Sequence, residues 1–322
     1  MSIAYGPVPS RRLGRSLGIN NIPPKICSYS CIYCQLGKTT HMQTGRGAFY
    51  DPRSIAVAVE EKVNQCREKV EQIDYLTFVP DGEPTLDVNL GKEINLLRPL
   101  AIKIAVITNA SLIWREDVRQ DLREADYVSL KVDAVSKETW RRINRPQKLL
   151  RLNNIADGML KFANMFSGDL ATETMLVQGV NDNSEEIERI ADLLKELKPD
   201  KSYLAIPIRP PAERAITAPG EEAINTAYQT LKERLSDVEY LIGYEGNAFA
   251  CTGNAKDDLL SITSVHPMRE DAVAELLHKA GANWQAVLEL IDDGRLVRLE
   301  YQGNRFYTRR LPTPETRRTF LV

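Results

Sequence analysis

The chain has 322 residues and a mass of 36.3 kDa, with 43% hydrophobic and 27% charged residues. These values are ordinary for a globular protein and exclude a disordered, collagenous or low-complexity chain. Its 42 Lys and Arg residues against 44 Asp and Glu residues give a net charge of −2, so no overall basic field points to nucleic acid.

The sequence gives no sign of a membrane or export segment. No stretch approaches the roughly 18 uninterrupted apolar residues that a membrane span needs. Residues 1–15 contain prolines and arginines but no apolar core of a signal peptide. We therefore expect a cytoplasmic protein without a membrane partner. In such a reducing compartment, three of five cysteines within eight residues indicate metal binding more than a disulfide.

Short apolar runs alternate with amphipathic segments through roughly the first 240 residues. Ile55, Val59 and Val63 recur at helical spacing within a helix expected over 52–70, and a second helix is expected over 184–197. Strand–helix repetition favours a mostly parallel sheet, open or curled into a barrel, with its chemistry at the carboxyl ends of the strands. The expected strands span residues 16–22, 75–79, 103–108, 127–132, 171–178, 202–208 and 239–243.

The pattern changes after about Asp257. Three short helices are expected over 259–265, 269–278 and 282–292, and a hairpin over 296–310 turns at Gln302-Gly303-Asn304. Three helices followed by a hairpin outline a winged helix. We therefore expect two domains, covering residues 1–256 and 257–322.

The cysteine cluster is the most specific signal in the chain. Cys27, Cys31 and Cys34 form a C-x3-C-x2-C motif directly after the first expected strand. Three thiolates on one loop can hold three irons of a cubane cluster and leave the fourth iron without a protein ligand. Such an open position is typical of a catalytic site. The alternative is a zinc site with His41 as the fourth ligand.

With Tyr33 in its aromatic position, this motif resembles the C-x3-C-x-aromatic-C signature of the radical S-adenosylmethionine (radical SAM) superfamily. The resemblance implies an α/β fold with a partial (β/α)6 barrel, and a [4Fe–4S] cluster on Cys27, Cys31 and Cys34. It also implies S-adenosylmethionine as cofactor, cleaved by one electron to methionine and a 5′-deoxyadenosyl radical that abstracts a substrate hydrogen. A flavodoxin or ferredoxin is the implied reducing partner.

Further segments support the resemblance. Asp81-Gly82-Glu83-Pro84-Thr85 follows the second expected strand and is similar to the superfamily's Gly-Gly-Glu motif. A cofactor ammonium needs carbonyl and carboxylate acceptors, and a glycine permits close approach. Polar residues at the ends of the third and fourth strands match contacts to the cofactor's ribose and carboxylate. The cofactor contacts that the resemblance implies are Tyr33, Gly82, Glu83, Pro84, Asn109, Ser129, Lys131 and Asp133; no catalytic residue is assigned.

Within the superfamily, the closest resemblance is to the branch of the wyosine-forming tRNA enzymes, through residues 82–86, Thr108-Asn109 and 130–134. The appended C-terminal domain favours a macromolecular substrate, either RNA or a peptide or protein. Its hairpin region carries interleaved aromatics and an excess of arginines, which could follow a phosphate backbone. Those arginines are Arg295, Arg298, Arg305, Arg309, Arg310, Arg317 and Arg318.

Arg11, Arg12 and Arg15 precede the first expected strand. They could be anion contacts for a nucleic-acid or phosphate-bearing substrate, but we favour a solvated arm packed on the barrel. Two other functions stay open at this level. One is an iron–sulfur redox-sensing regulator whose winged helix binds DNA, although the expected recognition helix over 282–292 contains no Lys or Arg. The other is a zinc-stabilised binding protein without turnover.

Overall fold

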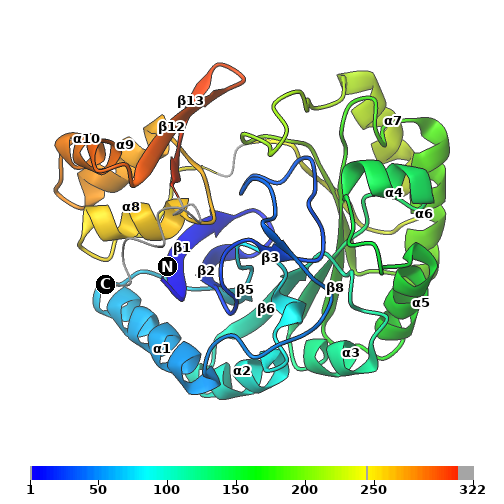
Figure 1. The fold of residues 1–322 in the computed structure, drawn as a ribbon, viewed down its shortest axis with the longest axis horizontal. Helices are drawn as coiled ribbons and strands as arrows, with labels where there is room; N and C mark the ends of the chain where they lie inside the picture. The colour runs from blue at the N-terminus through cyan, green and yellow to red at the C-terminus, as the bar shows by residue number, and fades with distance from the viewer. Residues whose placement is uncertain (1, 244–245, 311–322) are drawn as a thin grey trace.

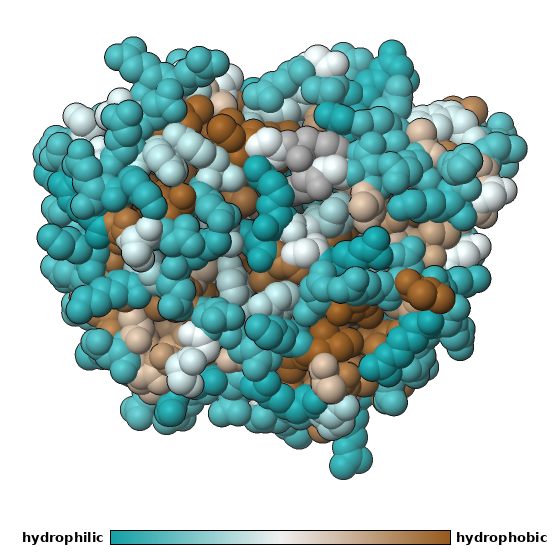
Figure 2. Space-filling model, turned by 180° about the vertical axis from the view of Figure 1, so that it is seen from behind, coloured by the Kyte–Doolittle hydropathy of each residue, from teal (hydrophilic) through white to brown (hydrophobic). Residues whose placement is uncertain are grey.

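A computed structural model of the chain describes residues 2–243 and 246–310 (Figure 1). The end of the expected 257–322 domain, with Arg317 and Arg318, lies outside these ranges. Within them, no helix combines the length and apolar character that crossing a bilayer requires. The face seen from behind is mostly hydrophilic, with hydrophobic residues visible in separate patches (Figure 2).

An eight-stranded sheet in the order β1-β2-β5-β6-β7-β8-β9-β10 forms the body of the described chain. Neighbouring strands from β2 to β10 run parallel, whereas β1 is antiparallel to β2. The sheet curls into a half-barrel with helices along its outside (Figure 1), which confirms the expected fold class. The strands are β1 (Ala4–Ser10), β2 (Gly14–Ile19), β5 (Tyr75–Phe78), β6 (Lys103–Thr108), β7 (Tyr127–Lys131), β8 (Asp169–Met175), β9 (Lys201–Ala205) and β10 (Val238–Leu241).

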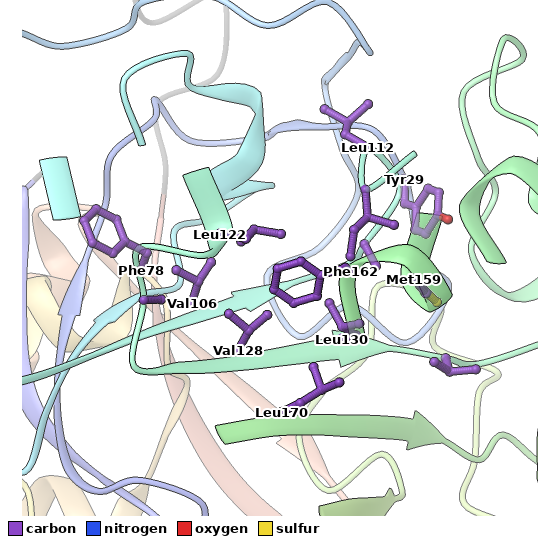
Figure 3. Packing of buried hydrophobic residues seen from close by; sticks show 14 of the residues in the cluster. Tyr29, Phe78, Val106, Leu112, Leu122, Val128, Leu130, Met159, Phe162 and Leu170 are labelled. Carbon is purple, nitrogen blue, oxygen red and sulfur yellow. The ribbon is translucent and has the colours of Figure 1, made fainter. Parts of the chain in front are cut away.

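Helices cross from each parallel strand to the next on the outer face of the sheet. Because side chains alternate along a strand, Val128 and Leu130 of β7 face these helices and pack near Phe162 (Figure 3). Tyr127 of β7 belongs instead to a separate cluster with small residues such as Ala105. The helices are α1 (Pro52–Glu68), α2 (Leu90–Leu97), α3 (Glu116–Leu122), α4 (Lys137–Ile143), α5 (Leu152–Ala163), α6 (Ser184–Leu197) and α7 (Glu221–Lys232).

Strand β1 was not predicted from the sequence. Pro7 and Pro9 interrupt its apolar pattern, and a strand that contains proline is tolerated mainly at the edge of a sheet. Here β1 is such an edge, and Tyr5 and Val8 bury their side chains against the C-terminal part of the chain. That contact covers an edge that would otherwise be open to pairing with another chain.

The C-terminal unit, residues 255–310, lies beside β1 (Figure 1). It contains the expected three helices and hairpin, together with a short strand that was not predicted. Gln302 and Gly303 both have positive φ (47° and 74°), as a two-residue hairpin turn requires. The winged-helix assignment and the domain boundary stay predictions. The elements are α8 (Ala255–Thr263), β11 (Met268–Arg269), α9 (Glu270–Lys279), α10 (Gln285–Asp292), β12 (Leu296–Tyr301) and β13 (Asn304–Arg309).

Candidate functional site

A cavity of about 280 Å³ lies at the carboxyl ends of the parallel strands, under the cysteine loop. It brings together residues that are more than 100 positions apart in the sequence, as expected for a site at this edge of a parallel sheet. Of the residues predicted from the sequence, Cys27, Cys31, Cys34, Tyr33, Gly82, Glu83, Asn109 and Lys131 line the cavity. Pro84, Ser129 and Asp133 do not.

Backbone hydrogen bonds fix the cysteine loop at both of its sides. It begins with β3 (Ile26–Cys27), which pairs with β4 (His41–Met42), and the amide of Glu83 donates to the carbonyl of Ile26 at 3.1 Å. On the other side, the amide of Ser30 donates to the carbonyl of Asn144 at 3.0 Å. The loop is therefore held between the β5 end and the segment after α4.

Two side-chain amides approach the cysteine sulfurs. Nδ2 of Asn109 lies 3.4 Å from Sγ of Cys27, and Nδ2 of Asn144 lies 3.4 Å from Sγ of Cys31. Hydrogen bonds to ligand sulfurs stabilise thiolate and tune an iron–sulfur cluster, so these donors fit a cluster site. Asn109 was expected to contact the cofactor; in the structure its amide also donates to Ser28 Oγ at 3.0 Å.

Burial sets the protonation of the metal-free thiols. It raises the pKa of Cys27 well above its usual range and that of Cys31 to about 12. Burial also raises the pKa of Cys34, but the nearby ammonium of Lys25 works against that shift. These thiols are therefore neutral without a metal, and ligation must displace their protons.

The donor set suits a multinuclear cluster better than a single ion. Among the described residues, no three His, Cys, Asp or Glu side chains come together as the ligands of one metal ion. His41 is exposed on β4, where Nδ1 contacts Thr40 Oγ1 at 3.3 Å, and it does not line the cavity. This position of His41 gives no support to the zinc alternative, in which it would be the fourth ligand. Thiols spread around one cavity fit a cubane, which binds each cysteine through a different iron.

Glu83 joins two strand ends under the cavity. Its Oε1 accepts from Thr85 N at 3.1 Å and from the hydroxyls of Thr85 and Thr108 at 2.6 Å each, and its Oε2 accepts from Asn109 N at 2.8 Å. A carboxylate has about four acceptor sites. Donors of the protein itself thus occupy most of the acceptor sites of Glu83, which was expected to accept from the ammonium of the cofactor.

Gly82 is fixed by close approach of the backbone. A Cβ at this position would lie 2.0 Å from the carbonyl oxygen of Ile26, so only glycine lets the β5 end touch the cysteine loop. Pro84 starts the short 3-10 helix Pro84–Leu86 behind it and is buried.

Lys131 brings a positive charge into the cavity. Its Nζ donates to Glu173 Oε1 at 2.5 Å and lies 5.0 Å from the centre of the Tyr33 ring. Burial lowers the pKa of Lys131, and the neighbouring carboxylate of Asp133 opposes that shift. Ser129 is buried on the same strand, two positions deeper than Lys131.

Asp133 supports the site from outside the cavity. Its Oδ2 accepts from the hydroxyl of Tyr33 and from Nδ2 of Asn144, the latter at 2.7 Å. Its Oδ1 accepts from the amide of Met175 at 2.9 Å. The carboxylate therefore holds Tyr33 and Asn144 in place.

For Arg12, the interpretation as part of a solvated arm is wrong. This residue lines the cavity, forms an ion pair with Glu173, and burial lowers the pKa of its guanidinium. Arg11 lines the cavity as well, and Arg15 pairs with Glu71 at 2.9 Å. Arg12 reaches the cavity because β1 and β2 form a hairpin, whereas Arg11 is exposed and Arg15 is half-exposed. The sequence pattern did not reveal β1.

Other contributors were also missed. Glu173 lies in the strand expected over 171–178, whereas Asn144 directly follows α4, outside the elements expected from the sequence. For both residues, only the positions of their neighbours show their role. Arg209, at the cavity wall, donates to Gln35 Oε1 at 2.7 Å.

The C-terminal unit reaches the rim of the cavity. Gln35 Nε2 lies 3.3 Å from the carbonyl of Val265, and the hydroxyl of Tyr301 donates to the carbonyl of Pro207 at 3.1 Å. Nε2 of His266 lies 3.2 Å from a guanidinium nitrogen of Arg209. Burial lowers the pKa of His266 well below its usual range, so the imidazole is neutral.

A half-barrel with a C-x3-C-x2-C loop over the ends of its strands defines a class of enzymes. The family model of the radical SAM superfamily matches residues 21–199. The chain belongs to the radical SAM superfamily, and it is an enzyme of that superfamily.

One curated sequence and two solved structures illustrate what the chain is similar to. The chain is 48% identical over 313 residues to the UPF0026 protein MJ1312 of Methanocaldococcus jannaschii, with 97% of each chain covered. A crystal structure of a radical SAM methyltransferase from Sphaerobacter thermophilus has a TM-score of 0.51 at 16% identity and covers 70% of this chain and 66% of its own. A structure of TYW1 with a lysine-pyruvate adduct bound has a TM-score of 0.50 at 17% identity, with 69% and 74% covered. The two solved structures have the same fold as this chain.

Proposed function

We propose that this chain binds a [4Fe–4S] cluster through Cys27, Cys31 and Cys34 and reductively cleaves S-adenosylmethionine to generate a 5′-deoxyadenosyl radical. The observation that carries the proposal is the convergence of three thiols, Gly82 and Lys131 on one cavity at the carboxyl ends of the strands. Superfamily membership supports it independently.

The chain's own residues would orient the cofactors. When bound, the cluster supplies the electron that breaks the cofactor's sulfonium bond. Asn109 and Asn144 would donate to the ligand sulfurs, and Tyr33 would help shield them. Lys131 offers an ammonium to the cofactor's carboxylate, and residues 206–208 offer an apolar wall to its adenine.

For the substrate we propose a macromolecule, RNA or a peptide or protein, as in the branch that contains the wyosine-forming tRNA enzymes. The contacts of Gln35 and Pro207 with the C-terminal unit support this idea, because they put that unit at the cavity rim. A DNA-binding regulator is less well supported, since α10 contains no Lys or Arg.

The test is anaerobic reconstitution with iron and sulfide, reduction with dithionite and quantification of 5′-deoxyadenosine after addition of S-adenosylmethionine. We expect the nucleoside from the wild type and none from Cys31→Ala. Cys66→Ala is the matched control because Cys66 is buried on α1 and does not line the cavity. Full cleavage by Cys31→Ala, or a wild type that takes up no cluster, would contradict the proposal.

A further inference from the structure

A second recess, the basic cleft, opens on the outer face of the half-barrel at α4 and the start of α5. It has a volume of about 800 Å³. Its lining contains four cationic residues, Lys137, Arg141, Lys148 and Arg151, and no carboxylate. None of these four forms an ion pair within the described part of the chain, although the chain as a whole has a net charge of −2.

Local features add to this positive charge. The first turn of α5 carries no acidic residue, so the positive end of its dipole faces the cleft without compensation. The guanidinium of Arg151 rests on backbone carbonyls, with Nη1 2.9 Å from Lys148 O. Leu149, 71% exposed, lies between two lining residues and offers an apolar anchor among the charges. The cleft therefore fits an acidic macromolecular surface.

The cleft is connected to the cysteine loop by direct contacts. Trp140 lines the cleft, and its Nε1 donates to the hydroxyl of Tyr29 at 3.0 Å, with the two ring centres 6.0 Å apart. Tyr29 lies between Cys27 and Cys31 in the loop. Gln147, also in the cleft wall, donates its backbone N–H to Ser28 O at 2.9 Å.

The cleft does not open into the candidate active site. The lining of the cleft and that of the cysteine cavity share no residue. A small cavity of about 60 Å³ has Trp140 in common with the cleft and Lys131 in common with the cysteine cavity. Helices α4 and α5 also lie across the half-barrel from the C-terminal unit (Figure 1). A partner in the cleft would thus leave the substrate side free.

We infer that the basic cleft is the docking site for an acidic one-electron carrier protein that reduces the cluster. The inference rests on the proposed function, because it needs a cluster on the cysteine loop. In the step, the carrier is oxidised by one electron and the cluster is reduced by one; no bond breaks and no proton moves. Electrostatic attraction speeds such short-lived encounters, whose interfaces are small.

An RNA strand fits this cleft less well. Proteins that bind single strands stack bases on exposed aromatic rings. Trp140, the aromatic residue in the lining, is only 4% exposed and is engaged with Tyr29. A substrate nucleotide in the cleft would also lie outside the cavity that the three cysteines line.

The test measures binding of a purified flavodoxin, and separately of a ferredoxin, to the full chain with and without cluster, at several salt concentrations. The cleft variant is Arg141→Glu with Lys148→Glu, and the control is Lys92→Glu with Lys195→Glu. The control reverses two exposed lysines on α2 and α6 that form no ion pair in the described ranges. The charge-preserving pair Arg141→Lys with Lys148→Arg tests for simple loss of fold.

We expect the cleft variant to bind at least tenfold more weakly, with a flatter salt dependence, and the control and charge-preserving pairs to bind like the wild type. Dithionite, which needs no docking, should reduce the cluster of the cleft variant at the wild-type rate. Unchanged carrier binding by the cleft variant, or no binding by the wild type, would overturn the inference. So would loss of affinity for a single-stranded RNA oligonucleotide alone. Binding to the cluster-free chain keeps this result separate from failure of cluster assembly.

Discussion

Asn144 connects Cys31 to Asp133: its Nδ2 lies 3.4 Å from the cysteine sulfur and 2.7 Å from the carboxylate. The carboxylate in turn accepts from the amide of Met175 at the end of β8. Through Asp133 and Asn144, hydrogen bonds therefore connect the end of β8 to Cys31, a predicted cluster ligand. Sulfur ligands that accept hydrogen bonds favour the reduced, more negative cluster.

This contact predicts a change in redox potential. Asn144→Ala should make the cluster harder to reduce, lowering its potential by tens of millivolts while iron content stays close to wild type. Asn64→Ala, on the exposed side of α1, is the control. Potentiometric titration followed by EPR measures the cluster's redox potential in the wild type and in both variants. Equal potentials in the three proteins would rule out a role for the amide in tuning.

Gly82 and Gly45 make a matched pair near the cysteine loop. Gly82→Ala should impair cluster uptake and destabilise the fold by about 1–3 kcal/mol, because its Cβ would overlap the carbonyl of Ile26. At Gly45 nothing lies within 4 Å of an added Cβ, so Gly45→Ala should load normally. Iron analysis and urea unfolding of both variants give the comparison. Normal loading of Gly82→Ala would refute the close-approach argument.

Glu173 balances two half-buried cations, Arg12 and Lys131. Glu173→Gln leaves both charges without their carboxylate, so we expect a loss of about 3 kcal/mol in the free energy of unfolding. Glu185→Gln removes the exposed partner of Arg189 on α6 and should leave stability unchanged. Chemical denaturation at neutral pH distinguishes them, and equal stabilities would contradict the assigned ion-pair network.

Glu93 predicts a pH dependence of stability. Burial on α2, and then the nearby Asp87, raise its pKa to about 9, above the ordinary value of 4.5. The folded chain therefore holds a proton that the unfolded chain releases between these values. Its contribution is fully present below pH 4.5 and is lost as the pH rises through about 9, at up to about 1.4 kcal/mol per pH unit.

Glu93→Gln keeps the neutral shape and should abolish this loss. Its melting temperature should match the wild type near pH 4.5 and exceed it by several degrees at pH 8–9. Glu60→Gln, exposed on α1, should show no such trend. A difference between Glu93→Gln and wild type that does not vary with pH would mean that Glu93 is charged in the fold.

The sequence predicted most of the scaffold because periodic burial is a local property. Ser184–Leu197 and Lys103–Thr108 have the expected bounds, since each places apolar residues at a clear spacing. Strand β1 was missed because its two prolines conceal a strand that depends on contacts with the distant C-terminal unit. Local periodicity in a sequence does not show which distant segments contact each other.

The same distinction holds for the site. The cysteines and the Gly82-Glu83 turn were found because chemistry fixes their spacing. Asn144 and Glu173 were not assigned roles, since each acts through a partner more than 40 residues away. Pro84, Ser129 and Asp133 lie in the right segments but off the cavity, because strand alternation and turn geometry decide which side chains reach it.

The most direct test of the central claim is the EPR spectrum of the anaerobically reconstituted, reduced protein, recorded with and without S-adenosylmethionine. A cluster with one iron free of protein ligands should bind the cofactor directly, so its signal should change on addition, and the signal should be absent in Cys31→Ala. A reduced-cluster signal that S-adenosylmethionine leaves unaltered, or one that persists in Cys31→Ala, would contradict the account.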